Sequence, residues 1–202
     1  MSTSVRFDST EYLKAFRDHG RFPAIHNDLF ALIIAEGRGD RYLDLCCSTG
    51  LLAQRIAKFA GASFVMGVDG DSAALEAAKE HGVTVPLQPM KLGPESFAEL
   101  ATVITDNKIN VVIARRCLPE IMGPWPEYDR LFTDTLAEAG VREILLEGRV
   151  KTAKAVNRLC DVEKEAAVLA NRYTVANARG SCRRLTLCES RPVGTQPAPS
   201  AE

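Results

Sequence analysis

The 202-residue sequence has no apolar run approaching the roughly 18 residues that a membrane-spanning helix needs. Residues 1–12 also lack the apolar stretch of a secretory signal peptide. Neither sign of charge predominates, because 25 basic residues face 26 acidic ones, whereas nonspecific attraction to nucleic acid needs a basic excess. We therefore expect a cytoplasmic protein with no membrane contact and no strong sign of nucleic-acid binding.

The cysteines lack the C-x-x-C spacing of a metal or redox site. There are six, and Cys46 and Cys47 are adjacent, which suits neither a metal site nor an ordinary disulfide. We expect reduced thiols packed as small hydrophobes, and no bound metal. Aromatic residues make up only 6%, but the hydrophobic fraction of 46% is enough for the core of one globular domain.

What the sequence does contain is an alternation of strand and helix patterns. Two helices are expected before residue 38, one from about 8 and ending at Gly20, the other from 23 to 36. Strands then alternate with helices through short connections, which is typical of parallel crossover units. The expected strands are 41–47, 63–69, 83–88, 110–114 and 143–147, and the expected helices between them are 51–60, 72–81, 94–105 and 126–139.

The end of the chain departs from this alternation. A helix is expected over 154–171, followed by strands at 173–178 and 182–188 that a short connection joins as an antiparallel hairpin. The tail is rich in proline and small residues and is expected to be disordered. The predicted organisation is an N-terminal helical cap (1–38), an α/β domain (39–190) and a disordered tail (191–202).

Two turns carry the chemistry. Open parallel sheets bind ligands beyond the carboxyl ends of their strands, so we examined the turns after the first two strands. The first holds Asp44 and a turn of small residues ending at Gly50, where a ligand can approach the backbone at a helix N-terminus. The second ends at Asp69, 19 positions after Gly50, where a carboxylate can accept both hydroxyls of a ribose.

These residues resemble the class I S-adenosylmethionine-dependent methyltransferases, whose first motif is an acid followed by glycines at alternate positions. Asp44 matches the acid, Gly50 the last glycine, and residues 67–69 the second motif; the resemblance covers about 41–147. It implies an open, doubly wound, mostly parallel sheet of seven strands in the order 3-2-1-4-5-7-6, with the last strand antiparallel. It also implies S-adenosyl-L-methionine as cofactor, bound by Asp44, Cys46, Ser48, Gly50, Asp69, Gly70, Met90, Lys91 and Arg115.

The sequence departs from the family at two points. Cys46 and Ser48 stand where the family has glycine, and Met90 and Lys91 follow the third strand where the family has a carboxylate for adenine. A nicotinamide-dinucleotide fold is the nearest rival, but its fingerprint needs three glycines and this turn has only one.

Candidates for substrate binding and catalysis are fewer. Arg115 and Arg116 leave the fourth strand and are expected to meet a carboxylate of the cofactor or an anionic substrate, or else to form an ion pair with Glu120 or Glu127. His19, in the helical segment expected to cover the site, and Arg116 are the candidate catalytic residues. Cys117 follows them and is interpreted as a structural thiol rather than a nucleophile.

The predicted function is methyl transfer to an unidentified acceptor, with a small molecule favoured because no large recognition domain is inserted. A non-catalytic module that binds the cofactor or a protein partner is the alternative. The sequence leaves the oligomeric state open.

Overall fold

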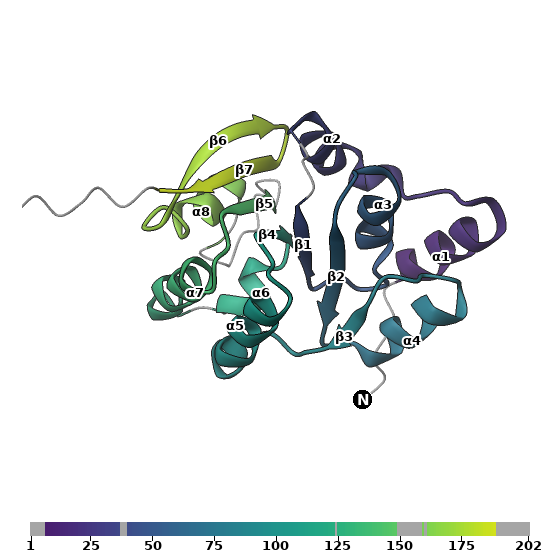
Figure 1. Ribbon diagram of the computed structural model, residues 1–202, viewed down its shortest axis with the longest axis horizontal. Helices are drawn as coiled ribbons and strands as arrows, with labels where there is room; N and C mark the ends of the chain where they lie inside the picture. The colour runs from purple at the N-terminus through teal and green to yellow at the C-terminus, as the bar shows by residue number, and fades with distance from the viewer. Residues whose placement is uncertain (1–6, 37–39, 124, 149–158, 160, 189–202) are drawn as a thin grey trace, which may run out of the picture.

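The fold is a seven-stranded sheet with helices on both faces (Figure 1). The computed structural model describes residues 7–36, 40–123, 125–148, 159 and 161–188. The strand order is β3-β2-β1-β4-β5-β7-β6, which confirms the predicted order and fold class. The first five strands run parallel and β7 pairs antiparallel with both β5 and β6. The strands are β1 (Arg41–Leu45), β2 (Phe64–Asp69), β3 (Leu87–Pro89), β4 (Val111–Arg115), β5 (Glu143–Glu147), β6 (Tyr173–Arg179) and β7 (Cys182–Leu187).

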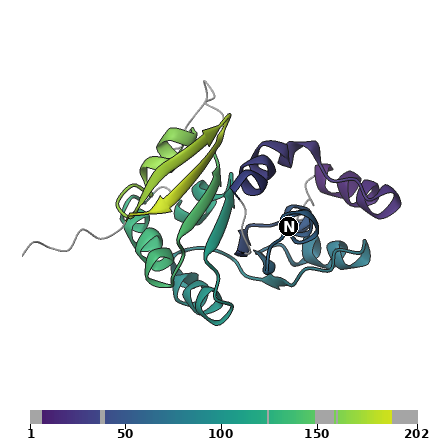
Figure 2. The same ribbon diagram turned by 45° about the horizontal axis from the view of Figure 1, so that its top comes forward.

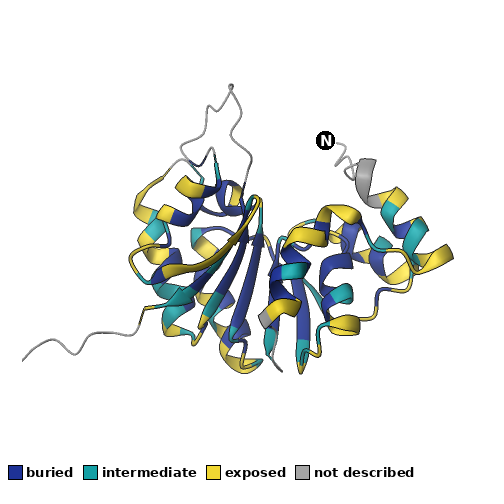
Figure 3. Cartoon of the chain, turned by 90° about the horizontal axis from the view of Figure 1, so that it is seen from above, coloured by how far each residue is buried: buried dark blue, intermediate teal, exposed yellow. Residues whose placement is uncertain are grey.

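Helices cover the two faces because successive strand residues point to opposite sides. In β1, Leu43 and Leu45 face one helical layer while Tyr42 faces the other, and buried strands lie between the two layers (Figure 3). The first layer contains α5 (Phe97–Asp106), α6 (Leu118–Met122), α7 (Glu127–Glu138) and α8 (Val162–Ala167). The second contains α2 (Asn27–Glu36) and α3 (Leu51–Phe59), and α4 (Ser72–Glu80) lies next to β3.

The two N-terminal helices pack in different places. α2 lies on the sheet, with Leu29 and Ile33 buried in the same cluster as β1 and β4. α1 (Phe7–His19) lies beside α3 and α4, where Leu13 packs with Leu51 and Ala78. The β6–β7 hairpin is at the opposite end of the molecule from α1 (Figures 1 and 2).

Several elements differ from the sequence prediction. The helix expected over 23–36 divides into a 3-10 turn (Ala24–His26) and α2. The third strand is confined to Leu87–Pro89, because Val83 packs against α1 and α4 instead of pairing. The short helix α6 was not predicted. Of the helix expected over 154–171, the structure shows α8, while residues 149–158 and 160 lie outside the described part. So do 37–39 and 189–202, and the division into cap, domain and tail stays a prediction.

None of the helices in the described ranges combines the length and the apolar character needed to cross a bilayer.

Candidate functional site

The turn after β1 has an alternating left-handed backbone. Cys46 and Ser48 both have φ of 51°, and Gly50 has φ of 65°. Left-handed backbone is natural for glycine but costs other residues roughly 1–2 kcal/mol. The turn therefore holds the conformation of a loop with glycine at alternate positions, although two of the three residues are not glycine.

The turn is anchored to the neighbouring strand. The Cys47 amide donates to the Val68 carbonyl at 3.0 Å, and the Gly50 amide donates to the Cys47 carbonyl at 2.9 Å. A Cβ added at Gly67 would lie 2.6 Å from the Cys47 Sγ, so only glycine fits there. The packing of Cys47 over β2 thus fixes the height of the turn above the sheet.

Asp69, at the end of β2, joins this turn to the next one. Its Oδ2 accepts the Ser48 amide at 2.6 Å and its Oδ1 accepts the Asp71 amide at 2.8 Å. A carboxylate has about four acceptor sites, so each oxygen can also accept a ligand hydroxyl. Asp71, as predicted, caps α4 by accepting two backbone amides, which leaves Asp69 to the site.

The ends of β2 and β3 approach closely beside Asp69. The Met90 amide donates to the Asp69 carbonyl at 2.8 Å, and a Cβ on Gly70 would lie 3.2 Å from the Lys91 Cα. Met90 is buried and Lys91 is exposed, so the pair offers an apolar side chain and backbone groups. The structure thus brings Gly70, Met90 and Lys91 to the same edge of the sheet as Asp69.

Asp44 lies beneath the turn and is almost fully buried, with 2% exposure. Burial raises the pKa of its carboxyl to about 7, although Arg115 lowers it. The carboxyl also accepts a backbone hydrogen bond from Ala53 in the first turn of α3. Asp44 therefore ties β1 to the helix that begins at Gly50.

Two thiols meet at the end of β1. Cys46 lies in hydrogen-bond contact with Cys117, and the Cys117 thiol donates to the Leu45 carbonyl at 3.7 Å. The contact with Cys46 and burial raise the pKa of Cys117 well above its usual range. Cys117 is thus a neutral packed thiol, in agreement with its interpretation as structural.

A buried carboxylate links the ends of β4 and β5. Glu147, 3% exposed, accepts Arg115 Nε at 2.7 Å on one oxygen and Arg116 Nη2 at 2.6 Å on the other. The predicted ion pair of these arginines with Glu120 or Glu127 is therefore wrong, because both pair with Glu147. Neighbouring strands end together here, since Arg115 stands opposite Glu147 in the β4–β5 register. Arg116 itself has φ of 56°, and its amide donates to the Glu147 carbonyl at 2.7 Å.

His26 is a further polar group at this edge. It is 6% exposed, and its Nδ1 has no hydrogen-bond partner in the described part of the chain. Burial, followed by the charges of Arg115 and Arg55, lowers the pKa of the imidazole to about 3, so the ring is neutral at pH 7. The burial of this residue could not be read from the sequence, because it depends on how α2 packs.

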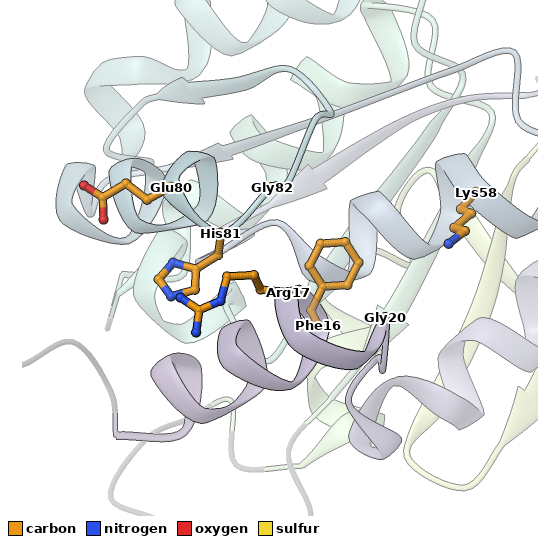
Figure 4. Close-up of a pocket in the computed structure, with 7 residues that line it drawn as sticks. All are labelled: Phe16, Arg17, Gly20, Lys58, Glu80, His81 and Gly82. Carbon is orange, nitrogen blue, oxygen red and sulfur yellow. The ribbon is translucent and has the colours of Figure 1, made fainter.

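His19 is not brought together with the other candidates. It ends α1 and is exposed, next to an open pocket of about 460 Å³ between the C-terminal ends of α1, α3 and α4 (Figure 4). Basic residues there, such as Arg17 and Lys58, lie in the last turns of helices, where they offset the negative helix ends. The charge of this pocket is thus explained by the helix ends alone. It is lined by Phe16, Arg17, Gly20, Lys58, Glu80, His81 and Gly82.

The described ranges contain no group of three or more His, Cys, Asp or Glu side chains arranged to hold an ion.

Comparison with known proteins identifies the family. Residues 36–185 match the family described as "Methyltransferase domain". Two curated proteins of Thermotoga neapolitana, each named ribosomal protein L11 methyltransferase, are similar to this chain. One is 31% identical over 120 residues (59% of this chain, 36% of the relative) and the other 45% over 62 residues (31% and 23%). The chain thus spans about a third or less of the length of these relatives.

Solved structures share the fold. Magnesium protoporphyrin IX methyltransferase from Synechocystis PCC 6803, solved with bound S-adenosylhomocysteine, is 18% identical with a TM-score of 0.55, covering 90% of this chain and 93% of that one. The bifunctional kinase-methyltransferase WbdD is 15% identical with a TM-score of 0.59, covering 86% and 41%. The chain belongs to the methyltransferase-domain family, and its fold is that of the class I S-adenosylmethionine-dependent methyltransferases.

Proposed function

We propose that this protein transfers a methyl group from S-adenosyl-L-methionine to an acceptor. The observation that carries the proposal is the pairing of the left-handed turn at 46–50 with the Asp69 carboxylate, joined by the Ser48 amide. Both features stand at the carboxyl edge of the central parallel strands, where sheets of this kind bind ligands.

The residues present fit the cofactor. Asp69 has the acceptor capacity for two ribose hydroxyls, and the turn from Cys46 to Gly50 exposes backbone at a helix N-terminus for the amino-acid portion. Gly70 lies so close to Lys91 that a side chain on Gly70 would crowd the Lys91 backbone. Because Gly70 has no side chain, a base can pack against the backbone here. Backbone groups beside Met90 would bind adenine in place of the carboxylate that the family has after the third strand.

The chain's own contribution to such a reaction is positioning. When bound, the cofactor supplies a methyl group on a sulfonium sulfur, already activated, and transfer leaves a neutral thioether. The residues of the site then have to hold the acceptor in line and keep water out. The structure accords with this, since Cys117 is a buried neutral thiol and His26 a neutral ring, neither suited to strong nucleophilic or base catalysis at pH 7.

A non-catalytic binding module is the second candidate. It is favoured by the side chains of Cys46 and Ser48, which add atoms where the family loop has none. Turnover with an acceptor separates the enzyme from a module that binds only the cofactor, and cofactor titration separates it from a module that binds only a protein partner. A small-molecule acceptor and a cytoplasmic location remain predictions from the sequence.

Calorimetric titration of the full chain with S-adenosylhomocysteine and S-adenosylmethionine tests the proposal. We expect micromolar dissociation constants, and roughly ten- to hundredfold weaker binding in Asp69→Ala from the loss of up to two charge-assisted hydrogen bonds. Asp106→Ala, an exposed carboxylate at the end of α5, is the matched control and should bind like the wild type. Absence of binding at millimolar concentration, or equal affinity in Asp69→Ala, contradicts the proposal.

A further inference from the structure

Arginine side chains gather at the carboxyl ends of β4 and β5. Arg115 and Arg116 share the single carboxylate of Glu147. Arg55, whose charge also acts on His26, donates to the neutral Asn27 Oδ1 at 2.9 Å and stacks on Phe30, with 4.2 Å from its Cζ to the ring centroid. The carboxylates of Asp28, Glu120 and Asp69 also act on buried groups at this edge, so the placement of the guanidinium groups, and not an excess of positive charge, distinguishes it.

Arg116 is held in place, and its guanidinium still faces solvent. Its side chain is 48% exposed, yet its backbone is left-handed and is fixed by a hydrogen bond from its amide and an ion pair from its side chain to Glu147. Strained backbone persists only where the surroundings over-determine it, and such positions concentrate at functional sites. A guanidinium carries five N–H donors, of which the described contacts with Glu147 use only part.

His26 provides a second, independent observation. Buried polar atoms are nearly always hydrogen-bonded, so an unpaired Nδ1 on a side chain that is 6% exposed needs a partner from outside the described chain. The ring lies within electrostatic reach of Arg115 and Arg55, beside the same charged group. A polar ligand at the end of β4 would offer acceptors to the exposed Arg116 guanidinium and a partner to the unpaired nitrogen.

We propose that the methyl acceptor carries a carboxylate or a phosphate, that Arg116 binds this anionic group at the carboxyl end of β4, and that His26 hydrogen-bonds the same acceptor. This inference rests on the proposed methyl transfer. Arginine suits the role because its planar fork matches both carboxylate and phosphate oxygens. Glu147 acts as a positioning residue, since it fixes both arginines while its single carboxylate can offset the charge of only one of them.

The test uses small anions as probes, followed by NMR of the full chain saturated with S-adenosylhomocysteine. The probes are phenyl phosphate and benzoate, with benzyl alcohol as the uncharged counterpart, and the signals are arginine Nε–H and the His26 ring. We expect millimolar binding of at least one anion and at least tenfold weaker binding of the alcohol. The stronger of the two anions tells phosphate from carboxylate.

Variants assign the site. Arg116→Gln should weaken anion binding at least tenfold, whereas Arg130→Gln, a side chain 86% exposed on α7 and paired with Asp134, should change it less than twofold. Equal binding of the alcohol, or an unchanged anion affinity in Arg116→Gln, overturns the inference. So does a tenfold loss of S-adenosylhomocysteine affinity in Arg116→Gln, because the arginine would then hold the carboxylate of the cofactor.

The two proposals fail differently. Wild-type protein that binds S-adenosylhomocysteine but neither anion overturns the acceptor inference alone. Wild-type protein that binds the anions in the absence of cofactor but never binds S-adenosylhomocysteine overturns the proposed function, and with it the acceptor.

Discussion

The turns at the two edges of the sheet both need left-handed backbone, but different residue types hold it at each edge. Chains leaving α3 and α4 at the amino edge turn through Gly61 and Gly82, which take left-handed backbone freely. At the carboxyl edge, comparable backbone angles fall on three non-glycine residues, Cys46, Ser48 and Arg116, which adopt them at a cost in strain, whereas Lys108 is the one such residue in the described part of the amino edge. The helix ends at the amino edge also keep charges such as Lys58 and Glu80 exposed, while the carboxyl edge buries Asp44, Glu147 and His26.

This contrast indicates that the functional residues lie at the edge where charged groups are buried and where non-glycine residues hold left-handed backbone. Exposed charges such as Lys58 or Glu80 have simple electrostatic roles and little dependence on their neighbours. Buried or strained groups persist only because other residues hold them. We infer that the carboxyl edge holds the functional site. Substitutions at the two edges that change stability and ligand affinity equally would contradict this inference.

The largest effect on stability is expected at Glu147. Glu147→Gln leaves Arg115 and Arg116 without their shared carboxylate and should lower the free energy of unfolding by about 2–3 kcal/mol, less than for a fully buried pair because Arg116 is half exposed. Glu80→Gln at the amino edge should change it by less than about 0.5 kcal/mol. Urea unfolding at pH 7 measures both, and similar values for the two variants would break the comparison.

Two buried groups should give opposite dependences of stability on pH. The carboxyl of Asp44 has a folded pKa of about 7, above its unfolded value, so the folded state holds an extra proton and stability falls as pH rises toward and through 7. From pH 5 to 8, we expect the wild type to lose about 2 kcal/mol relative to Asp44→Asn.

His26 should act in the other direction. Its pKa is lowered to about 3 in the folded state, so below about pH 6.5 the unfolded state binds the extra proton and stability falls with falling pH. From pH 7 to 5, the wild type should lose about 2 kcal/mol relative to His26→Leu. Urea unfolding across pH 5–8 reads both slopes, and parallel curves for wild type and variant would remove that residue from the buried set.

Glycine exchanges of opposite sign should have effects near 1 kcal/mol. Ser48→Gly relieves left-handed strain and should stabilise the fold by up to about 1 kcal/mol, while keeping the backbone bond to Asp69 and the affinity for S-adenosylhomocysteine. Gly82→Ala should destabilise by about 1 kcal/mol through strain alone, because a Cβ there meets nothing within 4 Å. Thermal unfolding that gives both variants the same sign would contradict the assignment of strain.

The smallest effect is expected at the amino-edge pocket. Lys58→Ser removes an exposed charge from its lining and should leave the affinity for S-adenosylhomocysteine within twofold of the wild type. Calorimetric titration checks this, and a tenfold loss would make the pocket part of the cofactor site.

The features that could be predicted from the sequence are those that depend on a local pattern of residues. The run of apolar residues in β5 and the acid that ends β2 were readable because strand period and turn chemistry are local, and the strand order came from the family resemblance. The partner of Arg116 was not readable, because Glu147 is 31 residues further along and meets it only through the β4–β5 register. The left-handed angle of Ser48 was equally hidden, since serine has no preference for it and only the anchored turn imposes it.

The position of β7 has a consequence for how the chain folds. β7 leaves the ribosome after the other six strands of this sheet, yet it is inserted between β5 and β6. The hairpin tip then reaches α2 through the Arg179–Asp28 pair, 151 residues apart. Contacts of such sequence separation form late, because a long loop must close first. The half of the sheet with Asp44 and Asp69 can therefore assemble during synthesis, while Glu147 stays at an open edge until Cys182 pairs beside it.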